Sequence, residues 1–540
     1  MKKYITLFVI SIILVLGACK EDFLEEKPYS AQAPLTLRDA LGFEASLVGL
    51  YNHLSTYYTW SGRQGWLSVW QVGTDVANAT ANQEGIEIPY YNYSVMNTED
   101  PAAERMWNRN YIMINLTNTI VDGLAAPDAK VTEAQRTAIA AEARFFRAFA
   151  YNHLATLFGG VPLLTSSITV PRTDFVRAPL ADINKLIEED LLFAVANLQD
   201  VTTAKAGRVN KYAAMQLLAE AYLRMGKPEL AEPQAQKIVD DNKFSLIKSR
   251  FGVKSSIPGD YYSDMFVYGN QRRKQGNTEV IWVLEQEHPT KVADGRTDNA
   301  QHRRVWVPQY YDVAGGGMAL ADSLGGRGLG RLRLSNWVIY NLYSSADIRN
   351  SKHNIRREFY YNDPNPKYAD RYGKKVPYTG PDTLHKIAPH TTKWGYFDPN
   401  DTFGYATIKD FILMRLGETY LLLAEANFKN NDLQGAADAI NELRKRAFAN
   451  YPVEGMVLPS QITLDFILDE RVRELIGEEN RRMTLMRTGT LVDRALRLNA
   501  GDKNKPISGL TQTHLLLPIP LREIQLNKDA VIEQNTGYNQ

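Results

Sequence analysis

Cysteine is nearly absent from this sequence: the 540 residues contain one, at position 19. A chain with a single cysteine forms no internal disulfide, so its folded part must be held together by a hydrophobic core. Hydrophobic residues make up 44% of the sequence. A chain of this length and composition can bury such a core as one large unit or as two closely packed ones.

An excess of either charge is also absent. Lys and Arg number 62 and Asp and Glu number 61, which gives a formal net charge of +1. Proteins that hold nucleic acid by its phosphates carry a clear basic excess. The balance therefore argues against a nucleic-acid partner and against a polyanionic substrate.

Long apolar runs are absent too, except at the amino terminus. Two lysines precede an apolar stretch over 4–16, and small residues then lead to Cys19. This is the pattern of a secretory signal, and its apolar part, about 13 residues, is shorter than the roughly 20 that a membrane-spanning helix needs. The sequence Leu-Gly-Ala-Cys resembles the site at which bacterial lipoproteins are cut and lipidated. We predict a signal peptide over 1–18 and a lipid on Cys19; the alternative is a secreted protein cut near Ala18.

Familiar catalytic motifs are missing as well. The sequence has no H-E-x-x-H, no G-x-S-x-G and no G-K-[ST]. The glycine run at 325–330 precedes no recognisable phosphate-binding helix, which favours a turn. Asp398, Asn400 and Asp401 could bind calcium through oxygen atoms, although a plain turn explains them as well. We predict no cofactor, no metal ion and no enzymatic activity.

Helical periodicity dominates what is present. Residues 19–34 are charged and then rich in Pro, Ser, Ala and Gln, as in a tether. The clearest helix is predicted over 131–160, where Thr132 and Gln135 form a capping box and two glycines mark the end. Its apolar residues recur at spacings of three and four, which places them on one face: Ile139, Ala143, Phe146, Ala150, Leu154 and Leu157.

Two later segments, 207–240 and 415–447, have the same pattern as each other. Small and apolar residues stand at equal offsets in both, as two antiparallel helices in close contact require. The pattern resembles the 34-residue tetratricopeptide repeat. Because the copies lie far apart in the sequence, we predict helical hairpins separated by a long insertion. The residues at these offsets are Leu218, Ala219, Ala231, Ala235 and Ile238, and Leu423, Ala424, Ala436, Ile440 and Leu443.

The insertion has a different composition. Residues 246–405 are rich in Gly, Tyr, Asn, Asp and Pro, and 279–284, EVIWVL, has the composition of a strand. Aromatic residues this frequent are rare in disordered chains, so we expect ordered loops, which often carry function. The prediction is a mainly α protein: a helical part over 35–245, the loop-rich insertion with the ligand-binding face, and a second helical part over 406–540.

Four blocks across the chain together resemble one known family. They lie at 141–163, 411–431, 468–489 and 514–538, and the last contains LPIP and ends in QNTGY. In this order, behind a lipoprotein signal and a tether, they are similar to the SusD/RagB family of outer-membrane nutrient-binding lipoproteins. Thr536 stands where the family commonly has proline.

The resemblance implies a tetratricopeptide-like scaffold with a looped face opposite. It implies a lipoprotein on the outside of the outer membrane that binds oligosaccharide and delivers it to a SusC-like TonB-dependent transporter, over which it acts as a lid. Lys20, Glu21 and Asp22 resemble the export signal of surface lipoproteins, although a solvated tether explains them too. A peptide-binding member, a structural partner of the transporter and a surface glycosidase are the alternatives.

The third block carries charged residues at helical spacing, which suits ion pairs. Glu474 and Glu478 could instead serve as an acid and a base, as a glycosidase would require. The charged residues are Glu470, Arg471, Arg473, Glu474, Glu478 and Arg482.

Two aromatic-rich stretches, 57–94 and 301–311, are candidates for binding sugar. A pyranose ring stacks its apolar face on Trp or Tyr, while polar side chains bond its hydroxyl rim. An aromatic residue in such a stretch belongs to the core more often than it contacts a ligand, and Trp70, in an alternating apolar run, is expected in the core. Trp60 and Tyr90 are the stronger ligand candidates. The candidate contacts are Trp60, Trp66, Asp75, Asn78, Tyr90, Tyr91, Arg304, Trp306, Tyr310 and Tyr311.

Overall fold

The structure is a computed structural model that describes residues 38–59, 62–63, 65–80, 85–287, 301–398, 407–499 and 505–539. The predicted signal peptide, Cys19, the tether and Trp60 lie outside these residues. Among the helices that are described, none is both long and apolar enough to span a membrane.

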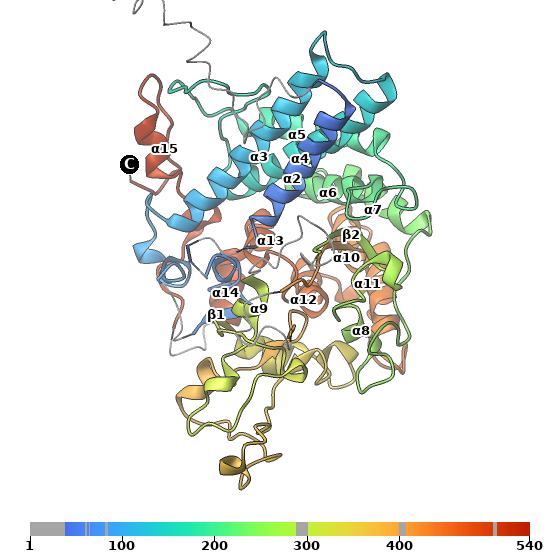
Figure 1. The fold of residues 1–540 in the computed structure, drawn as a ribbon, viewed down its shortest axis with the longest axis vertical. Coiled ribbons are helices and arrows are strands. Elements are labelled where there is room, and N and C mark those ends of the chain that lie inside the picture. Colours follow the sequence, from blue (N-terminus) through green and yellow to red (C-terminus); the bar gives the residue numbers. More distant parts are fainter. Residues whose placement is uncertain are drawn as a thin grey trace, which may run out of the picture.

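Four long helices open the fold and pack against one another (Figure 1). The helix predicted over 131–160 is among them: Thr132 and Gln135 form the expected capping box, and Gly159, at φ 75°, follows its last residue. Side chains of aspartate cap two of the others by accepting backbone N–H groups of the first turn. The four are α2 (Ala40–Ser55), α3 (Pro101–Ala125), α4 (Glu133–Phe158) and α5 (Leu180–Asn197).

Two helical hairpins occupy the predicted repeats, and all ten residues at the shared offsets are buried. The second hairpin packs on the first, so segments far apart in the sequence stack into one scaffold. The mainly α, tetratricopeptide-like fold predicted from the sequence is thereby confirmed. The hairpins are α6 (Lys211–Arg224) with α7 (Pro228–Asp240), and α10 (Leu416–Lys429) with α11 (Leu433–Ala447).

The remaining helices are short, and one of them, α13, joins the two halves of the chain. α12 packs on α10, and α13 packs on α4. These helices are α8 (Tyr261–Asp264), α9 (Gln301–Trp306), α12 (Leu464–Leu475), α13 (Arg481–Arg487), α14 (Leu491–Leu498) and α15 (Leu521–Leu526).

Strands are few, and within the described residues they form three two-stranded antiparallel sheets. The strand predicted over 279–284 is present as β2, which pairs with β6 so that Val280 lies opposite Arg415. The pairs are β1 (Ala77–Ala79) with β3 (Leu332–Leu334), β2 (Val280–Leu284) with β6 (Phe411–Arg415), and β4 (Ile355–Arg356) with β5 (His390–Thr391).

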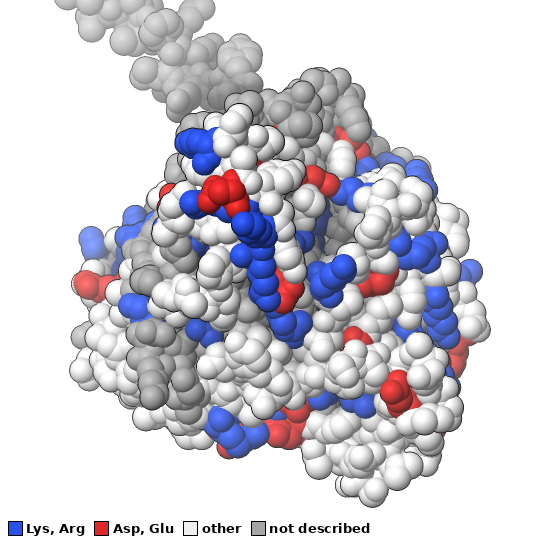
Figure 2. All heavy atoms as spheres, turned by 90° about the horizontal axis from the view of Figure 1, so that it is seen from below, with Lys and Arg blue, Asp and Glu red and all other residues white. Residues whose placement is uncertain are grey.

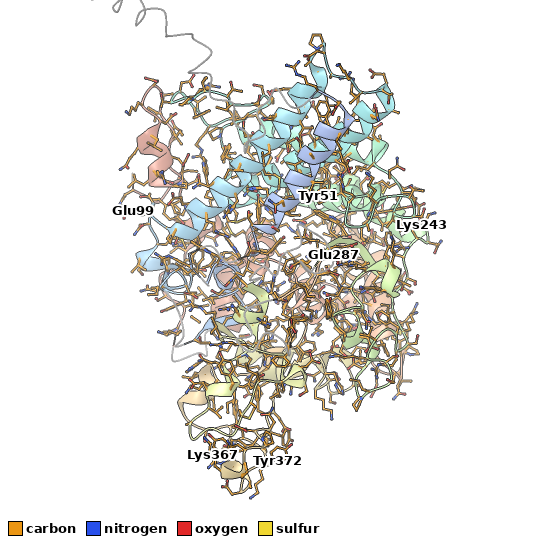
Figure 3. All side chains as sticks on the ribbon, in the orientation of Figure 1. Tyr51, Glu99, Lys243, Glu287, Lys367 and Tyr372 are labelled. Carbon is orange, nitrogen blue, oxygen red and sulfur yellow. The ribbon has the colours of Figure 1, made fainter. Side chains whose placement is uncertain are left out.

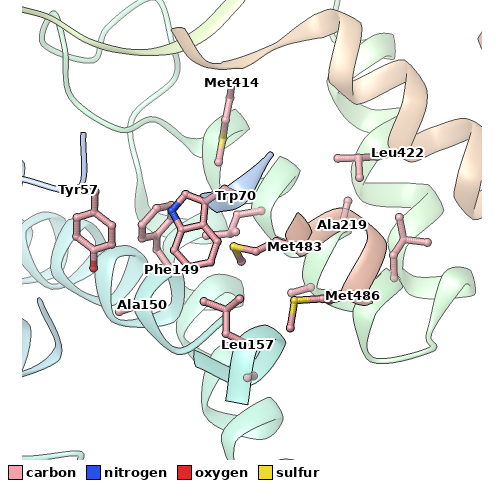
Figure 4. Close-up of a cluster of buried hydrophobic side chains, with 14 of the residues drawn as sticks. Tyr57, Trp70, Phe149, Ala150, Leu157, Ala219, Met414, Leu422, Met483 and Met486 are labelled. Atoms are coloured by element: carbon pink, nitrogen blue, oxygen red, sulfur yellow. The ribbon is translucent and has the colours of Figure 1, made fainter. Parts of the chain in front are cut away.

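One large hydrophobic core runs through the helical part and continues under the loops. Figure 4 shows a section in which Trp70, Phe149, Met414 and Met483 come from four separate elements. Trp70 is buried, as expected. Because helices from both ends of the sequence share this core, the helical parts form one packed body.

Much of the insertion forms one end of the molecule, drawn in yellow and orange at the bottom of Figure 1. It consists of ordered loops, short strands and single turns of helix around a small core of its own, which includes Val307, Tyr310 and Phe359. Lys367 and Tyr372 lie at its tip (Figure 3). We refer to this part of the molecule as the looped end.

Candidate functional site

A cavity of about 870 Å³ lies among the loops of the predicted insertion. Stretches 250–268, 322–325, 352–360 and 390–396 contribute to its walls, and Lys409 also lines it. Its volume is within the range of small-molecule sites, roughly 300–1,000 Å³. Figure 2 views the molecule from this end, with Lys and Arg atoms gathered across the middle of the face.

Aromatic side chains give the cavity apolar surfaces. Tyr268 is 37% exposed and Tyr360 is 48% exposed, whereas Phe266 and Tyr396 are buried in the wall. The ring of Tyr396 meets that of Tyr268 edge-on, with centroids 5.3 Å apart, and so supports it. A supported ring that is open on one side can stack on the apolar face of a sugar.

Basic side chains outnumber acidic ones in the lining, which contains six Lys or Arg and three Asp or Glu. Each carboxylate already has a basic partner; the pairs are Asp264 with Arg250 (2.6 Å), Asp322 with Lys254, and Glu358 with Lys375 (2.5 Å). The other four cations form no ion pair with any described residue; they are Lys352, Arg356, Arg357 and Lys409. The cavity is therefore positively charged although the chain as a whole is nearly neutral.

Of these four cations, one is buried and another is partly buried. Lys409 is buried, and its Nζ donates to the carbonyls of Lys393 and Gly395. Burial lowers its pKa to about 7, and Asp322 opposes that shift only in part. Burial also lowers the pKa of Arg356, whose Nε has no hydrogen-bond partner among the described residues. An anion in the cavity would offset the cost of keeping these groups charged.

Most of the contacts predicted between 57 and 94 are buried away from this cavity. Asp75, Asn78, Tyr90 and Tyr91 are all in the interior. The ring of Tyr90 is fully covered, and its hydroxyl donates to Asp100 at 2.7 Å. A ring without an open face cannot stack on a sugar, so Tyr90 here has a packing role in place of the predicted ligand contact.

Asp75 and Trp66 are each held by arginine. The carboxylate of Asp75 is buried, pairs with Arg481 at 2.6 Å and with Arg494 at 2.7 Å, and does not line this cavity, so its role is structural. Trp66 is half-buried, with the Arg105 guanidinium 4.6 Å from its ring centroid. A sugar contact by Trp66 stays a prediction, as does one by Trp60, which lies outside the described residues.

The second predicted stretch lies behind the wall of the cavity. Arg304, Trp306 and Tyr310 are buried, and the hydroxyl of half-buried Tyr311 donates to the Gly328 carbonyl at 2.9 Å. The neighbouring Val307 lines the cavity. No predicted contact residue that the structure describes lines the cavity. The described apolar side chains of both stretches pack in or against the hydrophobic cores instead.

The sequence did not lead us to predict the side chains that line the cavity. Tyr268 and Tyr360 were not selected, and neither were the cations between 352 and 357. A signal was present: KHNIRREFY, at 352–360, combines four basic side chains with two aromatic ones in nine residues. Ile355, the first residue of β4, is buried, and the charged residues of the stretch line the cavity.

The charged residues of the third block are structural, and they do not share one helix as their spacing suggests: α12 ends at Leu475 and α13 begins at Arg481, so Glu478 lies in the turn between them. Glu474 lies between Arg349, Arg415 and Arg446, and Glu478 pairs with Arg415 and Lys393. Burial would raise the pKa of both carboxyls, but these partners hold each below its usual range. A glycosidase needs one carboxylic acid that keeps its proton near neutral pH, and neither residue meets that need.

The described residues contain no group of three or more side chains placed to hold a metal ion. Two of the three oxygen-bearing residues considered for calcium, Asn400 and Asp401, lie outside those residues. The glycine run at 325–330 forms a turn, as expected: Gly325 and Gly326 have φ of 89° and 74°, and Gly325 borders the cavity.

The chain thus consists of stacked helical hairpins with a cavity among long ordered loops, and comparison with known proteins identifies its family. A model of the SusD family matches residues 278–538, and a second, described as "Starch-binding associating with outer membrane", matches residues 22–223. The chain belongs to the SusD/RagB family.

Individual relatives agree with this assignment. SusD-like protein P25 of Formosa agariphila is 26% identical, over 98% of this chain and 99% of its own length. Starch-binding protein SusD of Bacteroides thetaiotaomicron is 24% identical, over 76% and 74% of the two chains. The structure of a laminarin-binding SusD-like protein superposes with a TM-score of 0.68 at 22% identity, over 92% of this chain and 99% of that one. A SusD-like protein of Bacteroides fragilis gives 0.71 at 18% identity, over 94% and 100%.

Proposed function

We propose that this protein binds glycans in the cavity of its looped end. The observation that carries the proposal is the exposed ring of Tyr268, supported by Tyr396 in a cavity that also presents several hydrogen-bonding side chains. A sugar needs this combination, because one face of its ring is apolar and its rim carries hydroxyls. Relatives that are named for binding starch and laminarin support the proposal.

The proposal includes a location and a partner. A lipid on Cys19 would hold the protein at the outer membrane, facing the cell exterior. From there it would pass oligosaccharide to a SusC-like TonB-dependent transporter and act as its lid. Tethering keeps a binding protein at high effective concentration near its transporter. The two proteins can therefore transfer ligand even if their own affinity for each other is modest.

Calorimetric titration of the purified protein against a panel of oligosaccharides tests the binding function. We expect saturable binding of at least one of them. A panel of neutral and charged glycans that gave no heat of binding would contradict the proposal. Incubating the same glycans with the protein and examining product length separates a binding protein from a surface glycosidase, since only the latter shortens them.

One observation favours a second candidate, the uptake of peptides. The positive charge of the cavity would suit acidic peptides as well as glycans. Titration with an acidic peptide that contains no proline or aromatic residue, and with a glycan of the same charge, distinguishes the two, because only the glycan then offers a ring face for Tyr268 to contact.

A further inference from the structure

We infer that the cavity of the looped end takes glycans that carry oxyanions, either sulfate esters or carboxylates, and that Lys352, Arg356 and Arg357 bind those groups. The inference rests on the proposed function and adds to it the class of substrate. It depends on three features of the cavity: unpaired positive charge, fixed side-chain heads and an adjacent ring.

The positive charge has no counterpart within the described protein. All three carboxylates of the lining are already in ion pairs, so they are not available to Lys352, Arg356 or Arg357. A cavity with low-dielectric walls concentrates the field of such charges, and it attracts anions more strongly than an open surface does. A neutral glycan would leave this charge uncompensated, whereas an anionic glycan would neutralise it.

The arginine heads are held in place before any ligand arrives. Arg357 donates to the Asn350 side chain at 2.7 Å and to the Ile339 carbonyl at 3.1 Å. Arg356 donates to the Ser323 carbonyl, and its guanidinium lies 5.9 Å from the ring centroid of Phe359. A fixed guanidinium loses little conformational freedom when it binds, and its planar fork matches the oxygens of a carboxylate or a sulfate.

An aromatic ring lies in the same cavity as these cations. Tyr268 and residues of the stretch 352–360 line the same cavity. A sugar unit that stacked on Tyr268 could therefore present a charged substituent, on itself or on a neighbouring unit, to the arginines. Ring contact and charge contact together suit a glycan better than they suit a free inorganic anion.

The test uses two matched pairs of ligands and the intact protein. One pair is a sulfated galactan oligosaccharide and the same compound after desulfation; the other is an oligogalacturonate and its methyl ester. We expect the charged member of at least one pair to bind about tenfold more tightly, equivalent to about 1.4 kcal/mol, with the preference reduced in high salt. Preference within only the first pair identifies sulfate esters as the ligand, and preference within only the second identifies carboxylates.

Variants locate the contact. Lys352→Gln with Arg356→Gln should remove most of the preference for the charged ligand, and the exposed Lys352→Gln alone should remove part of it. Lys367→Gln removes the same charge at the exposed tip (Figure 3) and should change nothing. Thermal unfolding of each variant confirms that it is folded.

Two results would overturn the inference. One is equal affinity for both members of each pair; the other is a preference that the double variant and Lys367→Gln reduce equally. In either case a measured affinity for some glycan would leave the proposed function intact. Absence of binding to any glycan would contradict the proposed function itself.

Discussion

Asp75 and Arg481 form a buried ion pair, with 2.6 Å between Oδ2 and Nη2, across 406 positions of the sequence. Arg494 shares the same carboxylate at 2.7 Å. Burial would raise the pKa of Asp75, but the two arginines lower it below its usual value. One acidic side chain thus joins the turn before β1 to two helices of the carboxyl-terminal part.

Removing that carboxylate should destabilise the protein strongly. Asp75→Ala removes the carboxylate that Arg481 and Arg494 share. Breaking a buried pair typically costs about 3–5 kcal/mol, and we expect the lower end of that range, because Glu479 stays beside Arg481 and Asp469 beside Arg494. Unfolding in denaturant, followed by circular dichroism, measures the effect. Glu99→Ala is the control because Glu99 is exposed at the surface (Figure 3). Equal stability of the two variants would show that the pair contributes little.

Tyr268→Ala should weaken glycan binding without unfolding the protein. Tyr268 is 37% exposed and lies outside the described hydrophobic clusters, so the fold should tolerate its loss, while a stacking contact contributes about 1 kcal/mol, roughly fivefold in affinity. Calorimetric titration measures the change. Tyr372→Ala, at the exposed tip of the looped end, removes a ring that is remote from the cavity and should bind as the parent does. Unchanged affinity in Tyr268→Ala would place the sugar contact elsewhere.

The protein should lose stability as the pH falls from about 6.5 to 4. Burial lowers the pKa of His302 to about 3, with nearby Lys409 adding to the shift, and burial lowers that of His153 to about 4. Unfolded histidine takes up a proton near pH 6.5, so acid favours the unfolded chain by up to about 1.4 kcal/mol per pH unit for each such residue.

His302→Phe tests this dependence, because the residue stacks on Trp394 with centroids 3.8 Å apart and a phenyl ring can keep that contact. Midpoints of thermal unfolding, measured at several pH values across this window, should fall less steeply for the variant than for the parent. Parallel curves would exclude His302 as a source of the acid sensitivity.

Cys19→Ala should release the protein from the outer membrane. Without the thiol no lipid can be attached, and no described helix could replace it as a membrane span. Fractionation of cells followed by immunoblotting measures the distribution, with Ser30→Ala, in the predicted tether, as a control. A Cys19→Ala protein that stayed in the membrane fraction would refute the anchor.

Most of the fold could be predicted from the sequence, because helix caps and apolar spacing depend on residues close together in the chain. Thr132 and Gln135 marked the start of α4, and alanines at fixed offsets marked both hairpins. Packing of α10 on α7 was not readable, since it joins residues separated by the whole insertion.

The site was less readable, because a sequence does not show which face of a ring is covered. Tyr90 and Tyr268 are both tyrosines in turn-rich stretches, yet one is fully buried and the other is 37% exposed. The charge of the cavity was hidden for a related reason. Basic residues from separate stretches meet there, whereas their acidic counterparts are spread over the rest of a nearly neutral chain.

The pairing of β2 with β6 has a consequence for how such proteins diversify. These strands lie side by side, so the chain departs from the scaffold after Leu284 and rejoins it at Phe411, directly opposite. When both ends of an excursion are fixed together, doubling its length costs only about 0.6 kcal/mol of closure entropy. The segment between the two strands can therefore change in length and sequence during evolution, as a new nutrient would require, while the β2–β6 pair holds its two ends together.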